Sequence, residues 1–214
     1  MDNGVIQKNM LIIIDYGIGN LSSIRNMLKY IGIDSIISNK TEDIETADKL
    51  ILPGVGNFDY GMEQLHKSGL VNSLNEKVLN NKTPVLGICL GAQLLTEGSE
   101  EGVAKGLGWI KGRTVAFDKT KLASNQKIPH MEWTDVSNYN KFNLFTGMYN
   151  EPRFYFVHSY HLKIDNKEDI MADASYGYQF TAGVENGNIL GVQFHPEKSH
   201  KYGMSILGNF VKYY

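Results

Sequence analysis

The sequence has little of several features that mark unusual classes of protein. It contains one cysteine among 214 residues, so no disulfide can form within the chain, and we expect a reducing, cytoplasmic environment. Its 21 basic and 23 acidic residues nearly cancel, which gives no electrostatic reason to expect nucleic-acid binding. The first apolar run, residues 10–14, is far too short to span a bilayer, and we expect no membrane segment.

Motifs for metals and nucleotides are also missing. The chain has no CxxC, no HExxH and no paired carboxylates at the spacing of a metal site. It has no Walker loop, and Gly17-Ile18-Gly19-Asn20 is only a fragment of the dinucleotide fingerprint GxGxxG. We therefore expect no bound metal and no cofactor such as NAD or ATP.

The first half of the chain alternates strand and helix patterns. Residues 11–14 are apolar on both faces, which is typical of a strand inside a covered parallel sheet. Ile24, Met27, Leu28 and Ile31 then form one helix face. Further strands are expected at 35–38, 49–52 and 84–88, with helices from 41, between 57 and 80, and over 91–97. Such alternation predicts an α/β fold of flavodoxin-like type, with a parallel central sheet and helices on both faces.

The second half has a different pattern. Strand-like segments occur at 114–117, 154–161, 170–175, 179–185 and 189–194. Asn186-Gly187 between the last two is a hairpin signal, and a final helix is expected over 202–212. We expect these mixed or antiparallel strands to extend the parallel sheet within a single domain, 1–214. Residues 1–9 are expected to form a loose extension.

The strongest local feature is Gly87-Ile88-Cys89-Leu90-Gly91, between an apolar strand and a helix. It fits the sharp G-x-nucleophile-x-G elbow, with cysteine as the nucleophile. The positive end of the following helix would stabilise a thiolate there. Taken alone, these five residues fit a structural cysteine in a glycine-rich turn equally well.

Three other segments become informative only beside the elbow. His195-Pro196-Glu197 follows a strand and supplies a base with a carboxylate that would orient it. The turn at 53–57 has two glycines, whose backbone amides can face a carbonyl oxygen. The segment 157–161 places polar side chains at a strand end. Each alone is more simply a solvated loop, a tight turn or ordinary edge polarity.

Together and in this order, the segments resemble the class I (triad) glutamine amidotransferases. Within that family the closest likeness is to the glutaminase subunit of imidazole glycerol phosphate synthase, of histidine biosynthesis. The matching stretches cover nearly the whole chain from residue 11: IDYGIGNLSSIRNML, LILPGVGNF, PVLGICLGAQLL, GLGWIKG, IPHMEW, YFVHSY and GVQFHPEKS. Any one stretch is unspecific, but a collinear set of this kind is highly specific.

The resemblance implies site residues in three groups. The catalytic triad would be Cys89, His195 and Glu197. The oxyanion site would lie at Gly54 and Val55, completed by the amide of Leu90, and glutamine would contact Gly56, Gln93, His158, Ser159 and Tyr160. The partner would be a (β/α)8-barrel cyclase that receives ammonia, with Trp133, Tyr155 and Lys198 towards it. Those last three also fit two core aromatics and a solvated lysine.

Departures from the family pattern concern the choice of partner. Glu132 and Thr134 stand where H-M-G-W-N has glycine and asparagine, and Ala92 stands where the elbow usually continues with methionine. An alternative is therefore a related glutaminase that supplies ammonia to a synthetase forming a sugar amidine in surface-glycan biosynthesis; segments 151–156 and 200–204 resemble those relatives more. A non-catalytic regulatory partner is disfavoured by the intact triad. A stand-alone cysteine hydrolase on the same scaffold, which would work at full rate without a partner, is a third alternative.

Overall fold

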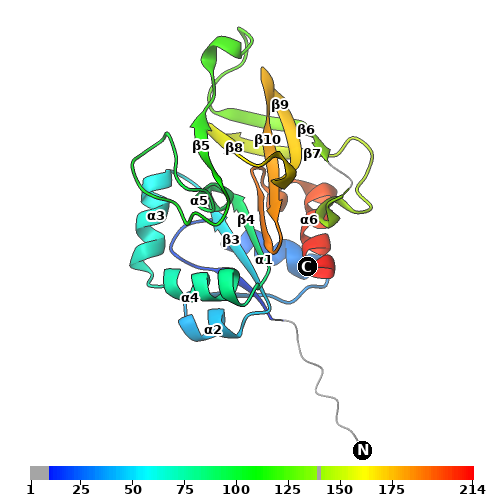
Figure 1. Cartoon of the computed structure of the whole chain (residues 1–214). Helices are drawn as coiled ribbons and strands as arrows, with labels where there is room; N and C mark the ends of the chain where they lie inside the picture. Colours follow the sequence, from blue (N-terminus) through cyan, green and yellow to red (C-terminus); the bar gives the residue numbers. More distant parts are fainter. Residues whose placement is uncertain (1–9, 139–140) are drawn as a thin grey trace, which may run out of the picture.

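The parallel part of the sheet has the strand order expected of a doubly wound α/β fold (Figure 1). The structure is a computed structural model that describes residues 10–138 and 141–214, so the expected extension at 1–9 lies outside the described residues. Across the sheet, the parallel strands are β2 (Ile36–Ser38), β1 (Leu11–Ile14), β3 (Lys49–Gly54), β4 (Val85–Cys89) and β11 (Ile189–Val192).

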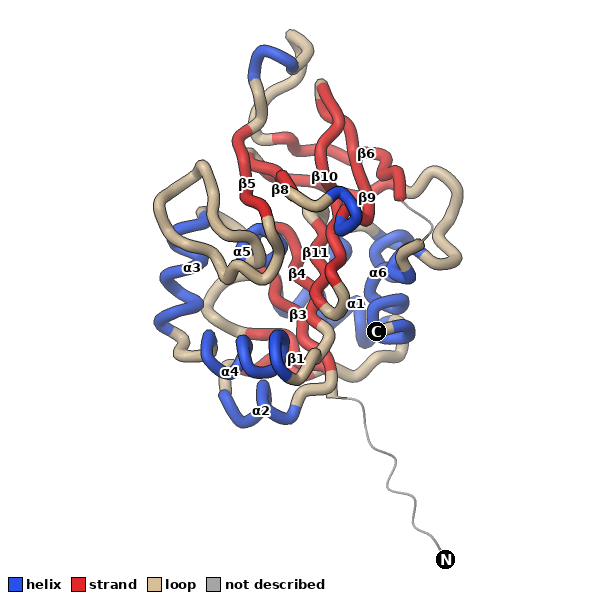
Figure 2. Tube along the Cα trace, viewed as in Figure 1, coloured by secondary structure: helices blue, strands red, loops and turns tan. Residues whose placement is uncertain are grey.

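Helices cover both faces of this parallel part (Figure 2). One face carries α1 (Leu21–Tyr30) and α6 (His200–Tyr213), whose apolar residues share a core cluster. The opposite face carries α2 (Thr41–Thr46), α3 (Phe58–Lys67), α4 (Val71–Asn75) with its π-helical continuation Glu76–Asn80, and the short α5 (Leu90–Leu94). The predicted flavodoxin-like arrangement is therefore confirmed.

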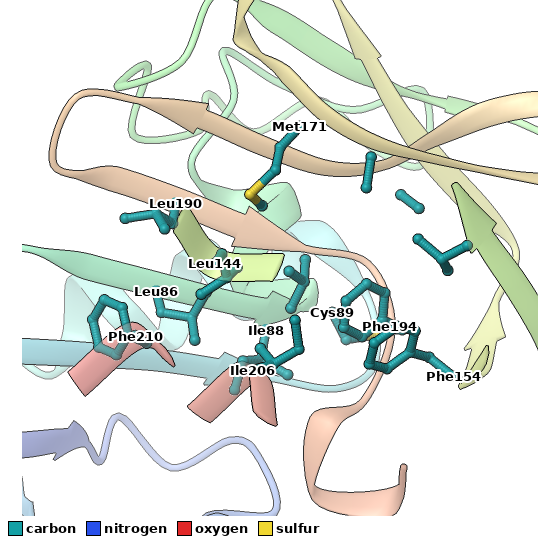
Figure 3. Packing of buried hydrophobic residues seen from close by; sticks show 14 of the residues in the cluster. Leu86, Ile88, Cys89, Leu144, Phe154, Met171, Leu190, Phe194, Ile206 and Phe210 are labelled. Carbon is teal, nitrogen blue, oxygen red and sulfur yellow. The ribbon is translucent and has the colours of Figure 1, made fainter. Parts of the chain in front are cut away.

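Strand β1 shows why an unbroken apolar run becomes a central strand. Leu11 and Ile13 pack in the cluster under α1 and α6, while Ile12 and Ile14 pack in the cluster under α3. All four are at most 3% exposed. Because side chains alternate between the faces of a strand, both faces must be apolar when helices cover both. Figure 3 shows the α1–α6 side, where α6 packs against β4.

The second half extends the sheet with antiparallel strands. They are β10 (Tyr178–Asn186), β9 (Ile170–Tyr176), β6 (His130–Asn138) and β7 (Arg153–His158), followed off the main order by β8 (Tyr160–Ile164) on β10 and β5 (Gly112–Ala116) on β8. The predicted hairpin joins β10 to β11, with Gly187 at φ +62° in its turn. In Figure 1 this antiparallel part rises above the carboxyl ends of the parallel strands.

The strand expected over 154–161 is wrong in one respect, because it is two strands. The chain breaks at Ser159: β7 before it pairs with β6, and β8 after it pairs with β5 and β10. Strand β6 was not predicted, because its exposed side chains interrupt the apolar alternation. Its place is decided by its two neighbours, β7 and β9, which lie far away in the sequence.

The helix expected over 91–97 is shorter than predicted and ends at Leu94. The reason lies in the following loop. Backbone amides of Leu107 and Trp109 donate to the carbonyls of Leu94 and Leu95, at 2.8 and 2.9 Å. Because the loop already provides hydrogen-bond donors for those carbonyls, the helix can end there without leaving them unpaired. Within residues 10–138 and 141–214, no helix has the length and apolar character needed to cross a membrane.

Candidate active site

The elbow places Cys89 between β4 and α5 in an unusual backbone conformation. Its φ is +54° and its ψ is −111°, a positive-φ conformation that residues with a side chain rarely adopt. The side chain is only 6% exposed. Since such strain persists only where the surroundings enforce it, the question is what holds this turn in place.

Two glycines allow the chain to close around the cysteine. A Cβ on Gly91 would lie 1.8 Å from the carbonyl oxygen of Leu52 on β3. A Cβ on Gly54 would lie 2.7 Å from the amide nitrogen of Gly91. Gly54 pairs directly with Cys89 across β3 and β4. The predicted oxyanion turn and the elbow are therefore neighbours in the sheet, and glycine is required on both sides of the contact.

His195 and Glu197 lie together beside the elbow, just beyond the end of β11. The His195 Nδ1–H donates to Glu197 Oε1 at 2.8 Å, and both side chains are 2% exposed. The other ring nitrogen, Nε2, is buried with no nitrogen or oxygen partner among the described residues. Cys89 and His195 line the same cavity, so the thiol and this ring face one space. The structure thus brings together the three residues that the sequence predicts as a triad.

Electrostatics at this site favour a charged imidazole. Burial lowers the pKa of His195, but the charge and hydrogen bond of Cys89, followed by those of Glu197, outweigh burial and raise this pKa to about 10. A protonated imidazole between a thiolate and a carboxylate is the arrangement that activates a cysteine nucleophile. The site can therefore perform acyl transfer, with the thiolate as nucleophile and the imidazolium as acid.

A cavity of about 270 Å³ opens in front of the thiol. It is lined by Val55, Gly56, Cys89, Leu90, Gln93, Glu101, Pro129, Val157, His158, Ser159, Tyr160 and His195. The structure thereby collects the residues predicted for glutamine contact around one pocket. A larger hollow of about 590 Å³ lies over β8, β9 and β10 and contains none of the predicted site residues.

A chain of hydrogen bonds fixes the back wall of this cavity. His158 Nδ1 lies 2.7 Å from the carbonyl oxygen of Tyr160, which can only accept, so His158 Nε2 is free to accept from His130 Nδ1 at 2.9 Å. His130 Nε2 in turn accepts from the Thr134 hydroxyl at 2.8 Å. Burial lowers the pKa of His130 to about 4 and that of His158 well below its usual value. Both rings are therefore neutral links.

The two glutamines near the thiol continue this network. The Gln93 side-chain nitrogen lies 3.1 Å from the Tyr160 carbonyl and 3.1 Å from Gln193 Oε1. The Gln193 side-chain nitrogen lies 3.8 Å from Cys89 Sγ. Gln93 was predicted as a substrate contact, and it lines the cavity.

The residues expected to face a partner form a cluster at the surface near His195. Trp133 is 36% exposed and lies 6.4 Å from Tyr155 across β6 and β7, edge to face. The Lys198 ammonium lies 5.3 Å from the centre of the Tyr155 ring, which is 6.5 Å from the His195 ring. We call Trp133, Tyr155 and Lys198 the aromatic cluster. It connects directly to the backbone of the site, because the His195 amide donates to the Tyr155 carbonyl at 3.0 Å.

Comparison with known proteins agrees with this geometry. Residues 12–213 match the family model described as Glutamine amidotransferase class-I. The chain belongs to the class-I glutamine amidotransferase family. Among solved structures, this amidotransferase chain is similar to PurLQS from Thermotoga maritima, with a TM-score of 0.71, 19% identity, and coverage of 96% of this chain and 99% of that chain. A likeness at that identity supports the fold.

Curated relatives of this amidotransferase are much more similar in sequence. Imidazole glycerol phosphate synthase subunit HisH 2 from Methanococcus maripaludis is 53% identical over 203 residues, covering 95% of this chain and 99% of the relative. Imidazole glycerol phosphate synthase subunit HisH 2 from Pseudomonas aeruginosa is 49% identical over 203 residues, with the same coverage.

Two residues of this amidotransferase site were missed in the sequence. Gln193 lies within the GVQFHPEKS stretch, but no spacing argument singles out a neutral amide. Glu101 lines the cavity from a loop, and its carboxylate also accepts the Phe58 amide at the start of α3, at 2.8 Å. Neither could be found without the tertiary contacts. Within the described ranges, no cluster of three or more His, Cys, Asp or Glu side chains could hold a metal ion.

Proposed function

We propose that this chain is the glutaminase subunit of imidazole glycerol phosphate synthase, which hydrolyses glutamine to glutamate and ammonia and passes the ammonia to a cyclase subunit. The observation that carries the proposal is the buried His195–Glu197 pair beside the strained Cys89, on the wall of a cavity of about 270 Å³. Relatives of that name at 49% and 53% identity over 95% of the chain support it.

The proposed reaction begins at the thiolate of Cys89. The sulfur attacks the side-chain amide carbon of glutamine, and His195 gives its proton to the departing ammonia. His195, now neutral, accepts a proton from water, which hydrolyses the glutamyl thioester and releases glutamate. Glu197 holds the imidazole through its 2.8 Å contact with Nδ1, so that Nε2 stays directed at the reacting atoms.

Backbone amides would stabilise the tetrahedral oxyanion. Gly54 ends β3 next to the thiol, Val55 follows it, and Leu90 begins α5 directly after Cys89. Amides in such a position act in a water-poor site, where a preorganised donor contributes about 3 kcal/mol to transition-state stability. Glu101 adds a carboxylate to the cavity wall, which suits the α-ammonium group of an amino-acid substrate.

The partner surface of the proposal is the aromatic cluster. Half-buried aromatic side chains with an adjacent cation are typical anchors of protein interfaces. The cluster lies against His195, so ammonia leaving Cys89 has a short way to a subunit bound there. A cyclase docked at this surface would lie beside the catalytic pocket.

Purified chain should be assayed for glutamine hydrolysis alone and with a cyclase subunit of imidazole glycerol phosphate synthase. Hydrolysis that depends on the cyclase, and that disappears in Cys89→Ala while the variant keeps its circular dichroism spectrum, supports the proposal. Undiminished turnover by Cys89→Ala contradicts it.

A second candidate acceptor is favoured by one feature of the surface. Glu132 is exposed next to Trp133 and lies 3.6 Å from His130 Nε2, so it adds a negative charge at the expected docking edge. A partner must match that charge. A synthetase that forms a sugar amidine in surface-glycan biosynthesis is therefore assayed in parallel, and hydrolysis switched on by it and not by the cyclase would assign the chain to that pathway.

A further inference from the structure

Gln193 is a buried amide beside the nucleophile. It is 0% exposed and follows Val192, which pairs with Ile88 in the parallel register of β11 and β4. Gln193 therefore stands next to Cys89, and neighbours in such a register project to the same side of the sheet. Its Nε2 reaches Cys89 Sγ at 3.8 Å, a hydrogen-bonding distance for sulfur.

A backbone carbonyl settles which end of the Gln193 amide faces the sulfur. The carbonyl oxygen of Tyr160 can only accept, so the Gln93 atom 3.1 Å from it is the NH₂ nitrogen. The same nitrogen lies 3.1 Å from the Gln193 side chain, which must present its oxygen there. The NH₂ group of Gln193 is therefore the end that meets Cys89.

The chemistry of a buried thiolate gives this contact a use. A thiolate away from water needs hydrogen-bond donors, and a bond in a low-dielectric site is stronger than in water. His195 supplies a positive charge that is later lost when its proton goes to ammonia. A neutral amide donor keeps its hydrogen throughout the cycle, so it can stabilise the sulfur anion in every step where that anion occurs.

We infer that Gln193 is a catalytic residue whose side-chain amide donates a hydrogen bond to the Cys89 thiolate, favours its ionised form and holds the sulfur towards the pocket. The inference deepens the proposed function and rests on it for its meaning in glutamine hydrolysis. The ionisation of the thiol, however, is measurable without glutamine and without a partner.

The test is the pH dependence of Cys89 alkylation by iodoacetamide, followed by mass spectrometry. Cys89 is the sole cysteine of the chain, so the modified mass reports this thiol alone. Gln193→Met keeps the length and removes the donor, and it should move the midpoint of the alkylation profile upward by about one pH unit. Gln193→Glu places a carboxylate against the sulfur and should move the midpoint at least as far.

The matched control is Gln179→Met. Gln179 lies on β10, outside the cavity in front of Cys89, and its amide donates to Asp173 Oδ2 at 2.9 Å. The Gln179→Met substitution removes an exposed amide of the same size from a nearby strand, and it should leave the alkylation midpoint unchanged. Thermal unfolding of all three variants identifies those that fold. A Gln193→Met midpoint equal to that of wild type and Gln179→Met overturns the inference.

A second measurement requires no change at Gln193. In the unmodified chain, the side-chain amide resonances of Gln193 should shift with the same pH midpoint as alkylation, and that shift should vanish in Cys89→Ala. Amide resonances that ignore the thiol titration overturn the inference even if the Gln193 variants do not fold.

Failure of the inference and failure of the proposed function give different results. If wild type shows no hydrolysis with either partner while the alkylation midpoint still moves in Gln193→Met, the function is wrong and the thiolate contact stands. If wild type hydrolyses glutamine with its partner and Gln193→Met keeps both its kcat and its alkylation midpoint, the function stands and the role of Gln193 is refuted. The inference expects kcat at pH 7 to fall about tenfold, with KM nearly unchanged.

Discussion

At the scale of single residues, the proposed chemistry depends on three residues that each cost stability on their own. Cys89 has a strained backbone, and His195 and Glu197 are buried polar groups. Each is compensated by another: Glu197 accepts from His195, and His195 meets the thiol. Removing one therefore changes the electrostatics of the others, which makes their coupling measurable.

Cys89→Ala should lower the pKa of His195. Burial already lowers this pKa, and the thiol is the larger of the influences that raise it to about 10. Without the thiol, the imidazole should titrate at least about one unit lower. Its ring resonances, followed by NMR from pH 5 to 11, measure the change, and His66 serves as an internal reference on α3. An unchanged His195 midpoint would show that no thiolate pairs with the ring.

At the scale of elements, β3, β4 and α5 approach each other so closely that glycine becomes obligatory. The elbow can form only where the first turn of α5 passes over the carbonyl of Leu52. The histidine chain on β6 and β7 is a second close contact between elements. In it, His130 on β6 links Thr134 on the same strand to His158 on β7, which lines the cavity. Both are interactions between elements and carry no signature in either element alone.

Gly91→Ala should destabilise the chain by at least about 3 kcal/mol, because the new Cβ would lie 1.8 Å from a backbone oxygen that cannot move without disturbing β3. Urea unfolding measures the loss. Gly208→Ala is the control: it lies in α6, and its Cβ would be 3.8 Å from Ile31, so it should stabilise by about 0.5–1 kcal/mol. Equal stability of the two variants would contradict the close approach.

His130 should make stability sensitive to acid. Its folded pKa of about 4 lies below the usual 6.5, so the unfolded chain binds more protons between these values. The stability contributed by the neutral ring is complete above about pH 6.5 and is lost as pH falls towards 4. Denaturant unfolding at pH 4.5 to 7 should show this slope, and His130→Phe should show a shallower one. Parallel slopes for the two proteins would count against a neutral, buried His130.

At the scale of the whole molecule, the antiparallel half provides what the parallel half lacks. The parallel sheet carries Cys89 at its carboxyl edge, and the added strands supply His158, part of the wall of the cavity and the two rings of the aromatic cluster. A single sheet continues through both parts, so the pocket and the expected docking surface are fixed to the same framework.

Trp133→Ala should weaken binding of the partner subunit about 30-fold, since exposed tryptophans at interface centres contribute about 2 kcal/mol or more. The thiol should keep its alkylation rate, because Trp133 does not line the cavity. Isothermal titration calorimetry with the activating partner measures the affinity. Val103→Ala is the control, because Val103 is 96% exposed on a loop outside the aromatic cluster. Equal affinities for both variants would place the interface elsewhere.

Sequence patterns alone predict the parallel half of the fold and the three residues proposed as a triad. A strand with apolar side chains on both faces must be covered on both sides to keep them from water. A helix with apolar residues every three to four positions supplies such a cover. The collinear motifs then placed Cys89, His195 and Glu197 on strand ends that a doubly wound sheet brings to one edge.

Tertiary contacts place the parts of the fold and the site that depend on partners distant in the chain. Three kinds of feature arise in this way: the break at Ser159, the position of β6, and the contacts of Gln193, Glu101 and Thr134. They depend on contacts that the local sequence pattern does not show. A hydrogen bond has no period in the sequence, because its donor and acceptor need only be close in space. Local patterns therefore predict strands and helices, while the environment of the thiol follows from packing.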